Sequence, residues 1–239
     1  MKALNIPLTE FLRPFFEPSD KICLRIFDDR KAGSIFKGMK VETSLAKVDA
    51  MAEDLKKHNA QNRGIYFVVN AGGHEDSEIK RINAQFMECD DLSLEEQWDK
   101  INAFPLEPSI VVKTRKSLHT YWLMKHADVA SFRRVQRALA ECFGGDKTCV
   151  NESRVLRLPG FYHCKQEPVM VECVKFNPEL RYTQAELEKH LPRLEQDAPR
   201  SLVINAPKGA QQGLTSVRNR CDFIGHCAQN AAHLSEHDW

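Results

Sequence analysis

Two carboxylates, Glu88 and Asp90, directly follow an apolar pair and are the first candidates for chemistry in this sequence. In an extended strand alternate side chains share a face, so Glu88 and Asp90 point the same way and the residues between and before them point into a core. Two carboxylates held close together repel each other unless a cation lies between them. The pattern therefore favours a divalent metal site, although an isolated acidic pair is more often a solvated turn.

A second polar cluster lies in a predicted β-hairpin and consists of Lys113, Arg115, Ser117 and His119. The last three are spaced at i, i+2 and i+4, so they share one face if this segment is extended. A guanidinium, a hydroxyl and an imidazole on one face can bind a polyphosphate through fixed charge and directed hydrogen bonds. The alternatives are a solvated turn for the basic residues and a buried, hydrogen-bonded histidine for His119.

The third cluster combines Asp146, which follows Gly144–Gly145, with Arg154 and Arg157. Each residue alone also fits an ordinary loop or a surface position. Together, the three clusters contain what two-metal phosphoryl transfer requires. Cations held by carboxylates activate an attacking 3′-hydroxyl and stabilise the leaving pyrophosphate, while arginines neutralise the remaining phosphates.

An α+β arrangement is predicted for the elements that must position these residues. Continuous or alternating apolar runs predict strands, and apolar spacing with capping patterns at Ser93 and Thr183 predicts helices. The expected strands cover residues 22–27, 65–69, 86–90, 109–113, 118–124 and 169–174. The expected helices cover 44–58, 93–101, 128–143 and 183–191, and Gly144–Gly145 is expected to end the third of them.

Composition is that of an ordinary globular chain. The sequence has 239 residues, 42% of them hydrophobic, and 34 basic residues against 33 acidic ones. A net charge of +1 means that any nucleic-acid surface must be a local patch, for which Arg133, Arg134 and Arg137 on one predicted helix face are candidates. The scattered cysteines, without a signal peptide or a membrane-spanning run, predict a cytoplasmic protein with free thiols.

Three segments are expected along the chain. Residues 1–192 are predicted to form the catalytic domain. Residues 193–213 are rich in Pro, Ala, Gln and Gly and predict a linker. From 214 to 239 a helical period resumes and continues to the last residue, which predicts the start of a further helical domain in a longer protein.

The motifs in this order resemble those of the archaeo-eukaryotic primase superfamily. The acidic-x-Asp at Glu88, the Ser-x-His at Ser117 and the Gly-preceded Asp146 are similar to its three motifs. The sequences of residues 119–122 and 153–161 resemble those of the primase-polymerases of plasmids, phages and other mobile elements. The resemblance covers about residues 20–180. In two places the sequence departs from it: Glu88 stands where Asp is more common, and Asp91 stands where Gly is common, so Asp91 is an alternative ligand.

This resemblance implies a template-dependent nucleotidyltransferase with an archaeo-eukaryotic primase fold, made of an RRM-like catalytic half and an N-terminal α/β half. Two Mg²⁺ or Mn²⁺ ions are expected at Glu88, Asp90 and Asp146. Nucleotide contacts are expected from His119 and Ser117, with Lys113, Arg115, Arg154 and Arg157 as the basic residues. Single-stranded DNA and nucleoside triphosphates are the expected partners, with a helicase domain in the same chain or on a partner.

Three other possibilities remain open at this point. Zinc could be bound by His163, Cys164, Cys149 and Cys173, but their spacing is not that of a zinc motif, and buried thiols are the simpler interpretation. A metal-dependent nuclease or replication initiator also needs carboxylates and histidines, although no His-hydrophobic-His motif is present. A catalytically silent nucleic-acid-binding module is the third possibility.

Overall fold

The computed structural model describes residues 1–30 and 35–194. Its first β-sheet has the strand order β2-β1-β3-β7, and every neighbouring pair in it is antiparallel. The strands span Ile22–Asp28 (β1), Met39–Thr43 (β2), Arg63–Val68 (β3) and Val155–Arg157 (β7). Because β7 comes late in the chain, it brings Arg157, and Arg154 directly before it, to a sheet that is otherwise N-terminal.

The second sheet is centred on β6 and carries the predicted hairpin. β6 pairs antiparallel with β4 and β5 and parallel with β11, while β10 pairs with the other edge of β5. The strands span Ala84–Met87 (β4), Ile110–Lys113 (β5), Leu118–Met124 (β6), Glu172–Phe176 (β10) and Arg181–Tyr182 (β11). A separate two-stranded sheet joins Tyr162–His163 (β8) to Val169–Met170 (β9). The predicted mixture of sheets flanked by helices is confirmed.

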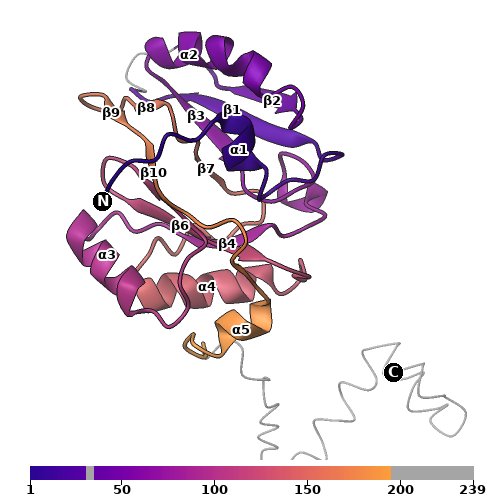
Figure 1. Cartoon of the computed structure of the whole chain (residues 1–239), viewed down its shortest axis with the longest axis vertical. Helices are drawn as coiled ribbons and strands as arrows, with labels where there is room; N and C mark the ends of the chain where they lie inside the picture. The colour runs from indigo at the N-terminus through magenta and orange to yellow at the C-terminus, as the bar shows by residue number, and fades with distance from the viewer. Residues whose placement is uncertain (31–34, 195–239) are drawn as a thin grey trace, which may run out of the picture. The chain divides into compact units, whose positions relative to one another are not determined.

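Helices cover the outer faces of the two sheets (Figure 1). Helix α2 packs on the first sheet, and α3 and α4 pack on the second. The helices span Leu8–Leu12 (α1), Ala52–Ala60 (α2), Leu94–Ala103 (α3), Phe132–Phe143 (α4) and Gln184–Glu188 (α5), and the short 3-10 turns span Asp49–Met51 (η1) and Asp76–Glu78 (η2). Within the described residues, no helix is long and apolar enough to cross a membrane.

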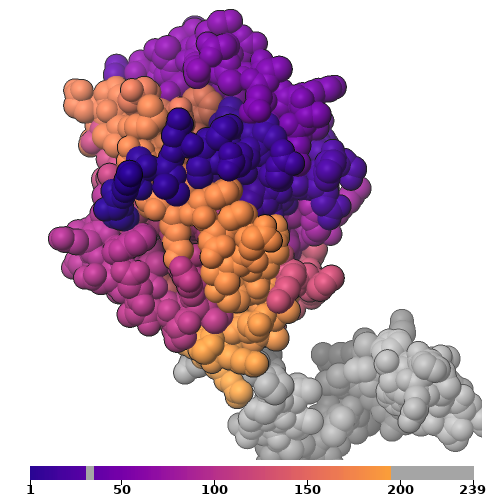
Figure 2. Space-filling model, in the orientation of Figure 1, coloured from indigo at the N-terminus to yellow at the C-terminus, as the bar shows by residue number. Residues whose placement is uncertain are grey.

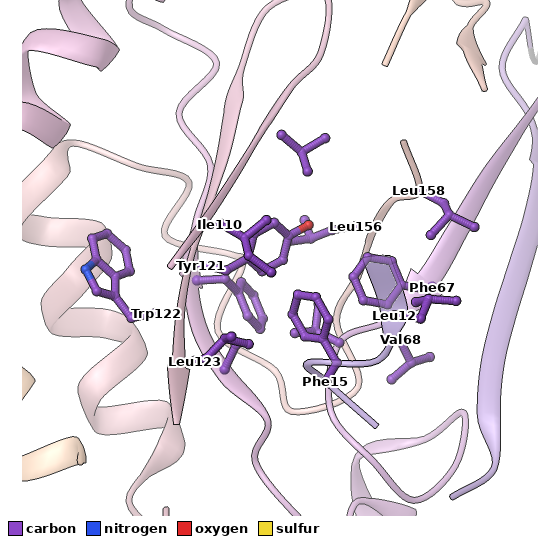
Figure 3. Close-up of a cluster of buried hydrophobic side chains, with 14 of the residues drawn as sticks. Leu12, Phe15, Phe67, Val68, Ile110, Tyr121, Trp122, Leu123, Leu156 and Leu158 are labelled. Carbon is purple, nitrogen blue, oxygen red and sulfur yellow. The ribbon is translucent and has the colours of Figure 1, made fainter. Parts of the chain in front are cut away.

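The core lies between the two sheets and is rich in aromatic side chains (Figure 3). Phe15, which follows α1, contacts Phe67 of β3 and Tyr121 of β6, with ring centroids 5.3 Å apart in both pairs. Trp122 points to the opposite face of the second sheet, where it packs 5.6 Å from Phe143 of α4. Because successive residues of β6 face the two layers, both faces of this strand are buried, which explains its continuous apolar pattern.

The N-terminal and C-terminal parts of the described chain also meet. Leu4 donates its amide to the carbonyl of Cys173 in β10 at 2.8 Å. Figure 2 shows the indigo N-terminal segment lying against the orange segment on this face. The N-terminal segment therefore pairs with the edge strand β10 of the second sheet before the chain enters α1.

Several local predictions are confirmed by their hydrogen bonds. Ser93 and Glu96 form a reciprocal capping box at the start of α3, and Thr183 and Glu186 form another at α5. Gly144 ends α4 in the left-handed region, with φ of 68°. These contacts are made within a few residues, which is why a sequence pattern alone locates them.

The predicted helix over 44–58 is wrong at its start, because α2 begins only at Ala52. The segment before it, residues 44–51, instead forms hydrogen bonds with the N-terminal part of the chain. Leu45 accepts a hydrogen bond from the Thr9 hydroxyl (3.3 Å), and Asp49 accepts one from the Thr9 amide (3.0 Å). Similarly, the predicted strand over 169–174 is two strands, β9 and β10, in two different sheets.

The predicted strand over 86–90 is also too long, since β4 ends at Met87. Beyond it the backbone makes contacts with other partners. The carbonyl of Glu88 accepts from the amide of Asp146 (3.2 Å), and the amide of Cys89 donates to the Ser117 hydroxyl (3.1 Å). Apart from residues 193 and 194, the predicted linker and the predicted helical segment at 214–239 lie outside the described residues.

Candidate active site

A cleft of about 780 Å³ is lined by side chains from both sheets. Most of the predicted site residues line it: Glu88, Asp90, Arg115, His119, Asp146, Arg154 and Arg157. Their elements differ, because β4 leads into the acidic pair, β6 carries His119, the loop after α4 carries Asp146, and the last two flank or belong to β7. The fold thus gathers residues that are far apart in the sequence.

Glu88 is a buried carboxylate of the cleft, with a side chain only 16% exposed. Its Oε1 accepts a hydrogen bond from Arg154 at 2.8 Å, and its Oε2 lies 3.4 Å from His119 Nε2. Burial raises the pKa of Glu88, but His119, the Cys149 thiol and Arg154 outweigh it, so the net pKa is lowered. The Glu88 side chain is therefore an anion inside the protein at neutral pH.

Asp146 is brought to Glu88 by its own backbone. Its amide donates to the Glu88 carbonyl at 3.2 Å, and the preceding Gly145 leaves the space for this approach. A Cβ atom on Gly145 would lie 2.8 Å from that carbonyl oxygen. The carboxylate accepts the amide and the hydroxyl of Thr148, both at 2.7 Å. Burial opposes ionisation, but these bonds prevail and lower the pKa of Asp146.

Replacing Gly145 by alanine is therefore expected to separate Asp146 from Glu88. The clash should cost about 1–3 kcal/mol of unfolding free energy and weaken the binding of Mn²⁺ followed by electron paramagnetic resonance. Gly144→Ala is the matched control. It strains the backbone, because φ is +68° there, but the added Cβ would meet no atom closer than the Lys100 amine at 3.6 Å, so the contact between Asp146 and Glu88 is not pushed apart. Equal losses of Mn²⁺ binding in the two variants would contradict this role for Gly145.

Asp90 lies at the exposed rim of the cleft. Partial desolvation and, next, the negative charge of Glu88 raise the pKa of Asp90. A carboxylate whose ionisation is opposed by another carboxylate gains most from a nearby cation. The anionic state of Glu88 and Asp146 favours a cation beside them. In the described part of the chain, the set of potential ligand atoms that converges there comes from Glu88, Asp146 and Cys149, and Asp90 is not in it.

His119 is buried, with 4% of its surface exposed, and its Nδ1 atom has no hydrogen-bond partner among the described residues. Burial lowers the pKa of His119 to about 4, although Glu88 acts in the other direction. The ring is therefore neutral at pH 7, with one N–H to donate. An incoming polar ligand could accept that hydrogen bond.

Two predicted nucleotide-binding residues are not brought into the cleft. Ser117 is buried below it, where its hydroxyl accepts the amide of Cys89. Lys113 points elsewhere and lies 3.6 Å from Glu172. In this structure Ser117 holds the acidic loop in place, and a direct contact with a nucleotide stays a prediction.

Arg115 and His163 supply unpaired donors on another wall of the cleft. The Nε and Nη2 atoms of Arg115 and both ring nitrogens of His163 are buried, and none has a hydrogen-bond partner among the described residues. Buried polar atoms without partners are costly, so their presence favours a polar ligand at this wall. Lys165 adds positive charge here. His163 was considered only as a zinc ligand and Lys165 was not considered, although both lie within four residues of the 153–161 segment that carries the resemblance.

Arg157 does not present a free guanidinium to the cleft. It forms two hydrogen bonds with Asp29, at 2.8 and 2.9 Å, and both side chains are almost fully buried. Its guanidinium also lies 4.6 Å from the centre of the Tyr66 ring. Gly64 leaves room for the pair, because a Cβ there would lie 2.7 Å from atoms of each partner. To bind a phosphate as predicted, Arg157 would have to give up hydrogen bonds that hold it to Asp29.

Arg154 and Cys149 complete the acidic cluster. Arg154 Nη2 lies 3.7 Å from Asp146 Oδ2, and the Cys149 thiol donates to Glu88 Oε1 at 2.5 Å. In the described part of the chain, two sets of potential metal ligands converge: Cys23, Glu42 and His74 in one, and Glu88, Asp146 and Cys149 in the other. Cys149 therefore lies with the carboxylates and not in a set with His163, Cys164 and Cys173.

The arginines predicted to face a template are mostly paired with acidic side chains. Arg133 forms hydrogen bonds with both carboxylate oxygens of Glu152, at 2.7 and 2.9 Å, and with Asp76 at 2.8 Å. Arg134 lies 2.6 Å from Glu188. Two of the three arginines are thus neutralised, whereas Arg137 is exposed and forms no ion pair with the described residues. A template contact on this face of α4 stays a prediction.

Comparison with solved structures identifies the fold. The chain aligns with the archaeo-eukaryotic primase domain of the cyanophage S-2L primase-polymerase with a TM-score of 0.66 and 28% identity, covering 78% of this chain and 97% of that one. It also aligns with primase RepB′ (TM-score 0.59, 17% identity, 93% and 67% covered) and with the RepB′ catalytic domain in complex with initiator DNA (0.56, 19%, 77% and 92%). The last two show the fold alone.

These structural matches and the acidic cleft define a domain of the archaeo-eukaryotic primase superfamily, as the sequence motifs predicted. Residues 74–197 match the RepB DNA-primase N-terminal domain, and the chain belongs to that family of replication proteins. A search of curated protein sequences finds no significant match.

Proposed function

We propose that this protein is a template-dependent nucleotidyltransferase, a DNA primase-polymerase that makes or extends primers in the replication of a mobile element. The single observation that supports this most is the acidic cluster itself. Glu88 and Asp146 are anions held together by a backbone hydrogen bond, with Asp90 at the rim and a neutral His119 against Glu88. The primase fold places this cluster in an open cleft large enough for a nucleotide.

The carboxylates of Glu88, Asp90 and Asp146 would hold Mg²⁺ or Mn²⁺ ions, which activate the attacking 3′-hydroxyl and neutralise the triphosphate when bound. The protein's own part is to fix these ligands. Ser117 positions the acidic loop through the Cys89 amide, and Gly145 allows Asp146 to reach Glu88. Neither contact requires a bound ligand, so the cluster is arranged in advance.

The incoming triphosphate would bind at the wall formed by His119, Arg115, His163 and Lys165. The histidines and Arg115 have nitrogen atoms without hydrogen-bond partners among the described residues, and Arg115 and Lys165 carry positive charge. Phosphate oxygens bind to this combination of hydrogen-bond donors and positive charge. Arg154 would join them once it leaves Glu88. Tyr66 forms part of the same cleft, with its hydroxyl 3.1 Å from Asp29, and would limit the space for the nucleotide.

Single-stranded DNA is the proposed template, in keeping with the initiator DNA bound to the RepB′ catalytic domain. A helicase, in the same full-length chain or as a partner, would supply the unwound strand. Because α4 offers little free positive charge, the template would contact the mouth of the cleft near Lys37 and Lys116. DNA affinity depends strongly on salt concentration. The contribution of each lysine can therefore be measured by comparing the DNA affinity of the wild type and a lysine variant at two ionic strengths.

A primer-extension assay tests the proposal. The full chain is incubated with primed single-stranded template, labelled nucleotides and Mn²⁺, alongside Asp90→Ala and His119→Ala. We expect extension by the wild type and a loss of roughly 10²-fold or more in both variants. Asp99→Ala, an exposed aspartate of α3, is the matched control and should extend normally. Extension that persists in Asp90→Ala would overturn the metal assignment.

A further inference from the structure

The thiol of Cys149 has surroundings that are unusual for a buried cysteine. The side chain is 3% exposed, yet its Sγ atom contacts carboxylates: Glu88 Oε1 at 2.5 Å and Asp146 Oδ2 at 3.3 Å. Structural cysteines are normally packed among apolar side chains and are chemically inert. Potential ligand atoms of these three residues all lie within 4.8 Å of one another. The acidic cluster therefore contains a soft ligand as well as hard ones.

A positive charge already lies among these three ligands. Arg154 Nη2 donates to Glu88 Oε1 at 2.8 Å, donates to the Cys149 sulfur and lies 3.7 Å from Asp146 Oδ2. One cationic group thus contacts all three side chains. Because like charges repel strongly in a partly buried site, a divalent ion and this guanidinium cannot share the position. Arg154 is in this sense the protein's own counter-ion for the cluster.

We propose that Glu88, Asp146 and Cys149 form a binding site for a thiophilic divalent cation of the zinc and cadmium class, which displaces Arg154. Oxygen ligands alone suit Mg²⁺, whereas a thiolate selects softer ions. Around tetrahedral zinc, sulfur and oxygen ligands lie about 3.5 Å apart, as follows from the usual bond lengths. The separation of Cys149 Sγ from Asp146 Oδ2 is 3.3 Å, so this edge of the site is already close to that geometry.

A buried imidazole lies beside these ligands, although it is not in the converging set. His119 is 4% exposed, its Nε2 lies 3.4 Å from Glu88 Oε2, and its Nδ1 has no partner among the described residues. Thiolate sulfur and carboxylate oxygen, which do converge here, are both ligands that zinc uses in proteins. Binding of the ion would release the Cys149 proton to solvent, since the thiolate is the ligand. The inference rests on the proposed function only in placing a cation at Glu88 and Asp146.

Titration with Cd²⁺ alone tests the site without any catalytic assay. The full chain, reduced and in excess Mg²⁺, is titrated while the ultraviolet thiolate-to-cadmium absorption is recorded. We expect a band that saturates at one equivalent in the wild type and is lost in Cys149→Ser. In Arg154→Gln, removal of the competing charge should lower the Cd²⁺ concentration at half-saturation about tenfold. Asp146→Asn should raise it.

Cys142→Ser is the matched control, because this cysteine is exposed on α4 and should leave the band unchanged. Circular dichroism of each variant checks that the fold is retained, and Asp146→Asn keeps the test valid if Cys149→Ser unfolds. A wild type without the band, or a band that persists in folded Cys149→Ser, overturns the proposal. These outcomes do not depend on nucleotide transfer, so they are separate from a failure of the proposed function.

Discussion

Replacing Glu88 by glutamine is expected to lower nucleotide incorporation by roughly 10³-fold while the protein stays folded. The side chain keeps its shape but loses the charge that faces Arg154, His119 and the proposed cation position. Loss of about 4 kcal/mol of metal-based charge stabilisation corresponds to that factor. The measurement is single-turnover primer extension at saturating nucleotide and Mn²⁺, with the unfolding midpoint recorded for each protein.

Asp91→Asn is the matched control for this prediction. Asp91 is the alternative ligand suggested by the sequence, but it is exposed, and it is not among the residues that line the cleft. We expect its rate to stay close to that of the wild type. A rate for Glu88→Gln within about tenfold of the wild type, or an equal loss in Asp91→Asn, would show that Glu88 is not the ligand.

Asp29→Asn is expected to cause the largest loss of stability, about 3–5 kcal/mol of unfolding free energy. The substitution removes the carboxylate that pairs with Arg157 and leaves a buried guanidinium without its counter-charge, since these side chains are 1% and 6% exposed. For a chain of this size the melting temperature should fall by roughly 10 °C. Urea unfolding followed by circular dichroism measures the difference.

The effect should also depend on pH with a defined sign. Burial opposes the ionisation of Asp29, but Arg157 and the Cys164 amide prevail and hold the pKa of this carboxyl below 3.8. Its stabilisation is therefore fully present above that value and is lost as pH falls through the lower, folded-state pKa. The difference in unfolding free energy between wild type and Asp29→Asn should be constant from about pH 7 to pH 5 and shrink below about pH 4.

Two further variants distinguish charge from geometry. Adding Arg157→Gln to Asp29→Asn removes the unpaired charge and should recover part of the loss, because the pair acts as a unit. Glu53→Gln breaks an exposed pair with Lys56, at 2.7 Å, and should change the unfolding free energy by less than about 1 kcal/mol. A similar small effect for Asp29→Asn would show that the buried pair contributes little.

Features determined by neighbouring residues could be predicted from the sequence. The capping boxes at Ser93 and Thr183, the end of α4 at Gly144 and the hairpin of β5 and β6 are confirmed. In each, the pattern and its hydrogen bonds lie within a short segment. Glu88, Asp90 and His119 line one cleft, as the primase motifs led us to expect, but both carboxylates lie beyond the end of β4, so strand alternation does not explain their position.

Features that depend on distant contacts could not be predicted. Asp29 lies two residues beyond the predicted strand over 22–27, yet its partner Arg157 belongs to β7. Cys149 looked like a small buried hydrophobe, and only the fold shows that it touches Glu88. No local pattern in the sequence encodes either approach. The same reason explains why Arg133 was predicted to be free: its partner Glu152 is on another segment.

The place of β7 in the first sheet has a consequence for biosynthesis. The strands β1, β2 and β3 leave the ribosome early, but the edge of β3 stays open until residues 155–157 follow the whole of β4, β5 and β6. An open edge can pair with other chains, so early release of the N-terminal part favours aggregation. The family match begins at residue 74, after β3, and so divides this sheet. A gene fragment that starts there, or ends before residue 155, encodes an incomplete sheet.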